Sequence, residues 1–195
     1  MRRVFVRSHG AKRDSPVPEE TAAAARAEVA CHAPFGNLFL DPLGEARACC
    51  VAAGYPLGDL SEQRLPEIWS APRTVALRQA MVDRDFSMGC GHCDWRLGAG
   101  LPSVHHAYDA LPADSLTPPS PRRLEINISN SCNLQCVMCN GDYSSAIRLH
   151  REGRPALPKV YGESFFSDLE AIIPNLQEVS FTGGEPFLVP EYYRI

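Results

Sequence analysis

The stretch that decides the fold is RLEINISNSCNLQCVMCN, residues 123–140. In its first half Leu124, Ile126 and Ile128 alternate with polar residues, and this period of two predicts a β-strand. Its second half carries three cysteines, spaced by three residues and then by two: Cys132, Cys136 and Cys139. We therefore expect a strand that delivers three thiols to the loop at its carboxyl end.

Two helices and a second strand follow this loop. Residues 142–153 predict a short helix that ends near Gly153, and residues 164–174 predict a longer one that stops at Pro174. The apolar stripe of the longer helix is Phe166, Leu169, Ile172 and Ile173. LQEVSF, residues 176–181, predicts a strand that runs directly into TGGEP. Strand, helix and strand in this order are typical of a parallel α/β architecture.

Three cysteines on one loop leave a metal group incompletely coordinated. A structural zinc site uses four ligands, whereas three thiolates on a [4Fe-4S] cluster leave the fourth iron open. Zinc stays an alternative, because a distant cysteine or histidine could complete such a site. TGGEP follows the next strand, at the sheet edge where α/β proteins bind ligands, and Glu185 adds a carboxylate there.

On these two motifs the chain resembles the radical S-adenosylmethionine (radical SAM) superfamily. The resemblance implies a [4Fe-4S] cluster on the three cysteines of the loop, with its open iron bound to the amino and carboxylate groups of S-adenosylmethionine. It implies further cofactor contacts from Met138, Thr182, Gly183, Gly184, Glu185 and Pro186. By this resemblance, Met138 stands at the position where the family usually carries an aromatic or other apolar residue near the adenine.

The resemblance also implies an activity. Reductive cleavage of S-adenosylmethionine would give a 5′-deoxyadenosyl radical, which abstracts hydrogen from an unidentified peptide or small molecule. We assign no catalytic residue beyond the cluster. The implied partners are this substrate and an electron donor such as flavodoxin or ferredoxin. The alternative function is a noncatalytic cysteine-rich module that holds zinc or an electron-transfer Fe–S cluster.

Five further cysteines precede this region: Cys31, Cys49, Cys50, Cys90 and Cys93. Residues 37–51 predict a hairpin whose return strand carries Cys49 and Cys50, and only one of two adjacent strand residues can face a given site. The arrangement resembles the SPASM domain or its shorter relative, the twitch domain. It implies one auxiliary [4Fe-4S] cluster on Cys31, Cys49, Cys90 and Cys93, with Cys50 as a reserve for Cys49.

Other interpretations of these cysteines stay open. Four cysteines could hold a structural zinc ion instead of a cluster. Cys90-Gly-His-Cys93 also spells the active-site tetrad of protein disulfide isomerases, but its flanks predict neither the preceding strand nor the following helix. We interpret His92 as a bystander, and His105 and His106 as surface residues.

Residues 60–82, between the hairpin and Cys90, predict helical turns capped by Ser61 or Ser70. Helical spacing marks five residues of this segment as core-facing: Leu65, Ile68, Trp69, Leu77 and Met81.

Together these patterns predict an α/β protein. It begins a radical SAM partial (β/α)6 barrel with about its first two strands, preceded by a small hairpin-plus-helix domain for the auxiliary cluster. The expected domains are a disordered N-terminus (1–27), a SPASM/twitch-like domain (28–97), a proline-rich linker (98–121) and the radical SAM core (122–195).

A complete barrel of this kind needs on the order of 180 residues at roughly 30 per unit. We therefore expect the chain to be the N-terminal part of a larger enzyme, inactive alone, with an unpaired edge on its second core strand.

Charge and composition argue against a nucleic-acid-binding protein, a membrane protein and an exported protein. The net charge of −4 lacks the basic excess that binds nucleic acid or anionic membranes. No apolar run reaches the roughly 18 residues of a spanning helix. The basic start has no apolar segment behind it, which favours a cytoplasmic protein over an exported one, with a short organellar transit peptide as the alternative. The cytosol keeps thiols reduced, so metal binding explains eight cysteines better than disulfides do.

Overall fold

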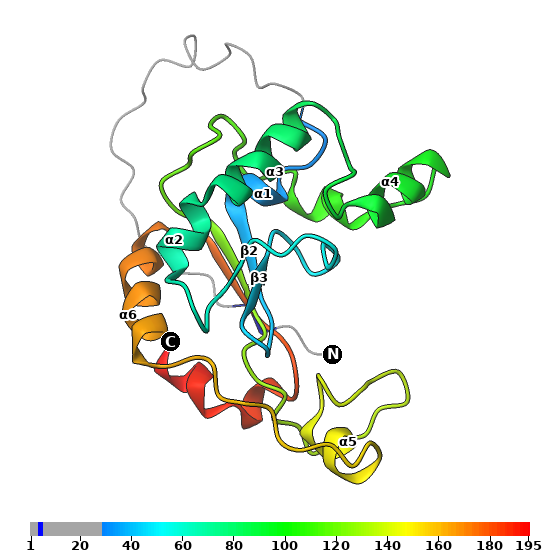
Figure 1. The fold of residues 1–195 in the computed structure, drawn as a ribbon, viewed down its shortest axis with the longest axis vertical. Helices are drawn as coiled ribbons and strands as arrows, with labels where there is room; N and C mark the ends of the chain where they lie inside the picture. Colours follow the sequence, from blue (N-terminus) through cyan, green and yellow to red (C-terminus); the bar gives the residue numbers. More distant parts are fainter. Residues whose placement is uncertain (1–3, 6–28) are drawn as a thin grey trace.

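The computed structural model describes residues 4–5 and 29–195 (Figure 1). The disordered N-terminus expected over residues 1–27 therefore lies outside the described residues, apart from positions 4 and 5. The strands are β1 (Val4–Phe5), β2 (Asn37–Leu40), β3 (Glu45–Arg47), β4 (Gly58–Asp59), β5 (Arg123–Ile126) and β6 (Glu178–Phe181). They form one sheet in the order β1-β6-β5-β2-β3-β4.

The connections between the strands carry helices and 3₁₀ turns. The α-helices are α1 (Ala33–Gly36), α2 (Leu65–Ser70), α3 (Pro72–Val82), α4 (Gly91–Gly98), α5 (Ser145–His150) and α6 (Glu163–Ile172). The 3₁₀ turns are η1 (Val104–Tyr108), η2 (Ile173–Asn175), η3 (Pro186–Leu188) and η4 (Pro190–Arg194). The chain is thus mixed α/β. Within the described residues, no helix has the length and apolar character needed to cross a bilayer.

The hairpin and the two core strands belong to the same sheet. β5 lies between β6 and β2 and runs parallel to both, with Leu124 opposite Leu38 and Val179. β3 returns antiparallel to β2, as the predicted hairpin requires. Nothing in the sequence pattern predicts the pairing of β2 with β5, because parallel strands are joined by long connections and not by a recognisable turn.

The outer edge of β6 is not unpaired, contrary to expectation. β1 runs antiparallel to β6 and places Val4 opposite Phe181 and Phe5 opposite Ser180. This short strand covers backbone groups that would otherwise be open to pairing with another chain. The strand order is that of an open sheet, and a partial barrel stays a prediction.

One face of the sheet forms the main hydrophobic core. Leu124, Ile126 and Ile128 are buried there together, as their alternation predicts. Helices α2, α3 and α6 cover this face (Figure 1). All five predicted core residues of the segment 60–82 are buried.

The stripe predicted for α6 is wrong at one position. Phe166, Leu169 and Ile172 are buried, but Ile173 is 40% exposed, because the α-helix ends at Ile172 and a 3₁₀ turn begins. Phe165 is buried instead, at 4% exposure.

The helix starts also differ from those predicted. Neither Ser61 nor Ser70 caps a helix: α2 begins after Arg64, whose backbone N–H donates to Glu67 at 2.8 Å. Helix α3 begins at Pro72, which suits the first helical position because its missing N–H would have no partner there.

Candidate functional site

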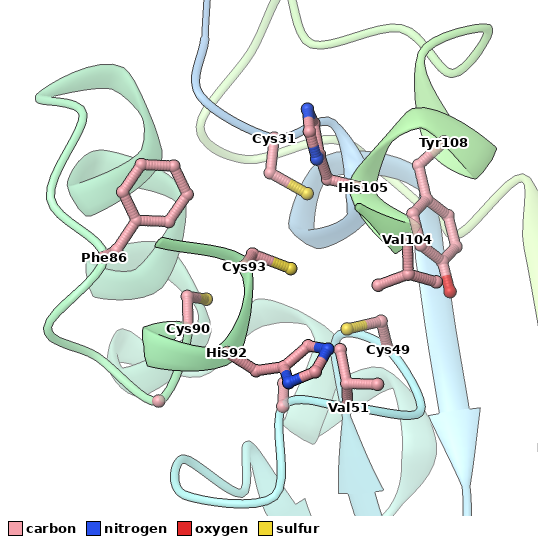
Figure 2. Close-up of a pocket in the computed structure, with 12 residues that line it drawn as sticks. Cys31, Cys49, Val51, Phe86, Cys90, His92, Cys93, Val104, His105 and Tyr108 are labelled. Atoms are coloured by element: carbon pink, nitrogen blue, oxygen red, sulfur yellow. The ribbon is translucent and has the colours of Figure 1, made fainter. Parts of the chain in front are cut away.

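The four cysteines predicted to hold the auxiliary cluster line one pocket. Figure 2 shows the sulfur atoms of Cys31, Cys49, Cys90 and Cys93 pointing into a shared space. We call it the four-cysteine pocket. Its thiols come from segments that are far apart in the sequence, so the fold of the whole region assembles it.

The sheet brings two of these segments to the same end. Cys31 precedes β2, and Cys49 follows β3, which runs back along β2. The side-chain amide of Asn37 donates to the carbonyl of Ala48 at 2.8 Å and ties the two segments together.

The prediction that Cys49 and Cys50 lie on the return strand is wrong, because β3 ends at Arg47 and both cysteines lie in the turn that follows. Within this turn Cys49 is buried and faces the pocket. Cys50 is exposed and does not line it.

Helix α4 supplies the other two thiols. Cys90 is its N-cap, and Cys93 lies in its first turn, where its backbone N–H donates to the carbonyl of Cys90 at 2.9 Å. The sequence flanks did not predict this helix. Residues 83–89 form turns without a strand, so the strand that a thioredoxin-type site needs before its cysteines is missing from this segment.

Burial disfavours charge on three of the pocket thiols, those of Cys31, Cys49 and Cys90. It raises the pKa of Cys31 to about 12 and that of Cys90 to about 11, and it also raises the pKa of Cys49. The remaining walls are largely apolar, with Val51, Phe86 and Val104 among them. A thiolate is therefore costly here unless a cation such as iron compensates its charge.

His105 is not a surface residue, contrary to expectation. It is 8% exposed and lines the four-cysteine pocket, because η1, which carries it, lies against that pocket and is bonded to β5. Burial is the main cause that lowers the pKa of His105. His106 is exposed, as expected, and its ring lies 3.9 Å from that of His105 between centroids. His92 lines the pocket as an exposed residue.

The other three cysteines lie in an exposed loop after β5, residues 132–139, which we call the three-cysteine loop. Its start is fixed to α5: the hydroxyl of Ser145 accepts from the backbone N–H of Cys132 at 3.1 Å. Cys136 is exposed, and Val137 and Met138 are 88% and 86% exposed. The thiols of this loop are therefore open to a large group bound from outside.

The TGGEP segment, residues 182–186, packs against the residues that lead into this loop. Gly183 and Gly184 have φ angles of +79° and +51°, a region that favours glycine. A Cβ on Gly183 would collide with the side chain of Asn127. The backbone N–H of Glu185 donates to the carbonyl of Ser131 at 2.8 Å. The two predicted motifs thus meet at the carboxyl ends of neighbouring parallel strands.

Asn127 is a candidate residue that the sequence analysis missed. It is 4% exposed, and its Oδ1 atom has no hydrogen-bond partner among the described residues. Its position directly after β5 was the available signal, because side chains at carboxyl strand ends commonly face a ligand.

The spacing of the thiols bears on what they can bind. Within residues 4–5 and 29–195, no three His, Cys, Asp or Glu side chains are grouped closely enough to hold one metal ion. The sulfurs of a tetrahedral zinc site lie about 3.8 Å apart, given Zn–S bonds of 2.3 Å. The thiolates of a [4Fe-4S] cluster bind different irons and therefore lie farther apart than the ligands of one zinc ion.

The two groups of thiols lie at opposite ends of the sheet. The four-cysteine pocket is at the amino ends of the parallel strands, whereas the three-cysteine loop and TGGEP are at the carboxyl ends. The two groups are separated by the length of a four-residue strand, about 13 Å, and by the loops at its two ends.

The comparison with protein families bears on the first of these groups. Residues 31–94 match the SPASM iron–sulfur cluster-binding domain. The match spans all four pocket cysteines and includes Cys50. The SPASM region therefore carries the signature of iron–sulfur binding, and SPASM domains occur in radical SAM enzymes. No curated protein matches the chain, and no solved structure matches it either.

Proposed function

We propose that the chain is part of a radical SAM enzyme and holds two [4Fe-4S] clusters. The first is an auxiliary cluster bound by all four thiols of the four-cysteine pocket. The second is bound by the three-cysteine loop, with one iron left for S-adenosylmethionine. The observation that carries the proposal is the convergence of four thiols on one pocket inside the region that matches SPASM.

The pocket suits an auxiliary cluster because of its donor set and its walls. Four buried or half-buried thiols provide the usual complement of ligands, and apolar neighbours keep water away from the bound group. Complete coordination leaves no position for substrate, so the role we propose for this site is structural or electron transferring.

The three-cysteine loop and TGGEP have complementary roles in this proposal. The loop offers thiols that can bind three irons, and Gly183 and Gly184 let the neighbouring backbone approach a cofactor closely. The carboxylate of Glu185 is half-buried and suits the amino group of S-adenosylmethionine. The bound group supplies reductive cleavage of that cofactor and thereby radical chemistry on an organic substrate.

Metal and sulfide analysis tests this proposal. After anaerobic reconstitution with ferrous iron and sulfide, we expect about eight irons and eight sulfides per chain, since each cluster holds four of each. Protein purified from cells grown with both metals should contain iron in large excess over zinc. One or two zinc ions per chain, with neither iron nor sulfide, would contradict the proposal and support the zinc-binding alternative.

A further inference from the structure

A buried histidine nitrogen in the four-cysteine pocket has no function in the account above. Nδ1 of His105 is buried and finds no hydrogen-bond partner among the described residues, although burying an imidazole nitrogen unpaired is unfavourable. His105 lines the same pocket as the four thiols, and Figure 2 shows its ring beside Cys31 at the edge of the space that the sulfur atoms face. An unpaired polar atom at such a position indicates that its partner is the group that the pocket binds.

The position of His105 is held firmly by its neighbours on η1. The Tyr108 hydroxyl donates to the buried carboxylate of Glu125 on β5 at 2.6 Å. Arg123, also on β5, donates to the carbonyl of Ala107 at 3.1 Å. These bonds attach η1 to the sheet at Ala107 and Tyr108, and they hold in place the backbone that carries His105.

We infer that His105 donates a hydrogen bond from Nδ1 to a sulfur atom of the cluster in the four-cysteine pocket and thereby raises its reduction potential. The inference rests on the proposed function, because it requires that cluster. A neutral imidazole carries one N–H, and the thiols already supply four ligands, so the ring acts as a donor beside the cluster and not as a fifth ligand.

The expected effect follows from charge. Reduction adds one electron to the cluster, and a hydrogen-bond donor at sulfur stabilises the more negative form. Removing the donor should therefore make the cluster harder to reduce. We expect about a tenfold change in the ratio of reduced to oxidised cluster at a fixed potential, which for one electron equals about 59 mV.

The test uses as its parent protein a variant that lacks the ligands of the second cluster and can bind only the auxiliary cluster. Cys132, Cys136 and Cys139 are changed to alanine in the full chain, which is reconstituted with ferrous iron and sulfide and titrated with dithionite under electron paramagnetic resonance (EPR). His105→Leu should bind as much iron as the parent. Its reduction potential should be lower by about 59 mV, which is about a tenfold smaller ratio of reduced to oxidised cluster at a fixed potential.

Two further variants separate the donor from packing. His105→Asn keeps an N–H near the position of Nδ1, so its cluster should have a reduction potential close to that of the parent. His106→Leu removes the exposed neighbouring ring, which does not line the pocket. Its cluster should also have a reduction potential close to that of the parent.

The outcomes distinguish the inference from the proposed function. A His105→Leu protein with the parent's potential contradicts the hydrogen bond, and one that loses its iron shows His105 to be a ligand instead. If the reduction potential of His105→Asn falls as far as that of His105→Leu, the donor role is also contradicted. A parent that takes up no iron and sulfide contradicts the proposed function itself.

Discussion

Replacing Cys49 with alanine should abolish the auxiliary cluster, whereas the same change at the adjacent Cys50 should leave it intact. The two residues are neighbours in one turn, but Cys49 is 8% exposed and faces the pocket, and Cys50 is exposed outside it. Loss of one of four thiolates opens the cluster to solvent and hydrolysis. We expect Cys49→Ala to lose about four irons and four sulfides per chain.

Cys50→Ala is the matched control for this experiment, and iron and sulfide analysis after reconstitution provides the measurement. Full iron in Cys49→Ala together with a loss in Cys50→Ala would show that the turn presents the other thiol. An equal loss of iron and sulfide in both variants would contradict the assignment of Cys49 as the ligand. It would mean that the cluster depends on the conformation of the turn and not on one of its two thiols.

Replacing Arg78 with methionine should cause the largest loss of folding stability. Arg78 is fully buried on α3, and its guanidinium donates to the carbonyls of Pro34, Trp69 and Leu116 at 2.9, 3.0 and 3.0 Å. Burial lowers its pKa to about 10, so it remains charged at neutral pH. Methionine fills similar space but leaves three carbonyls without this donor, at a cost of about 3–5 kcal/mol in the free energy of unfolding.

Arg73→Met is the control on the same helix. Arg73 is exposed, and its guanidinium lies over the ring of Tyr55 at 3.9 Å and donates to the carbonyl of Pro56. Because these contacts lie at the surface, this change should cost about 1 kcal/mol. Urea unfolding followed by circular dichroism compares the two variants. Equal midpoints would contradict the proposed importance of the buried guanidinium.

The parts of the fold that could be predicted depend on local patterns. Period-two alternation locates β5, and helical spacing identifies core residues such as Leu77 on α3 and Leu169 on α6. The thiols of the three-cysteine loop are likewise close together in the sequence, so their spacing alone suggests a shared ligand.

The parts that could not be predicted depend on tertiary contacts. The pairing of β2 with β5 joins segments more than 80 residues apart, without any local signal. Which thiol of the turn enters the pocket is set by the end of β3 at Arg47. The burial of His105 follows from the bond between Tyr108 and Glu125, which no spacing rule predicts.

The central claim is that the three-cysteine loop binds a cluster with one iron open to S-adenosylmethionine. The most direct measurement is the EPR spectrum of the reconstituted, dithionite-reduced chain before and after S-adenosylmethionine is added. We expect a reduced-cluster signal whose g values shift on addition, and no shift once Cys136 is replaced by alanine. A spectrum that S-adenosylmethionine leaves unchanged in the reconstituted wild-type chain would contradict the claim.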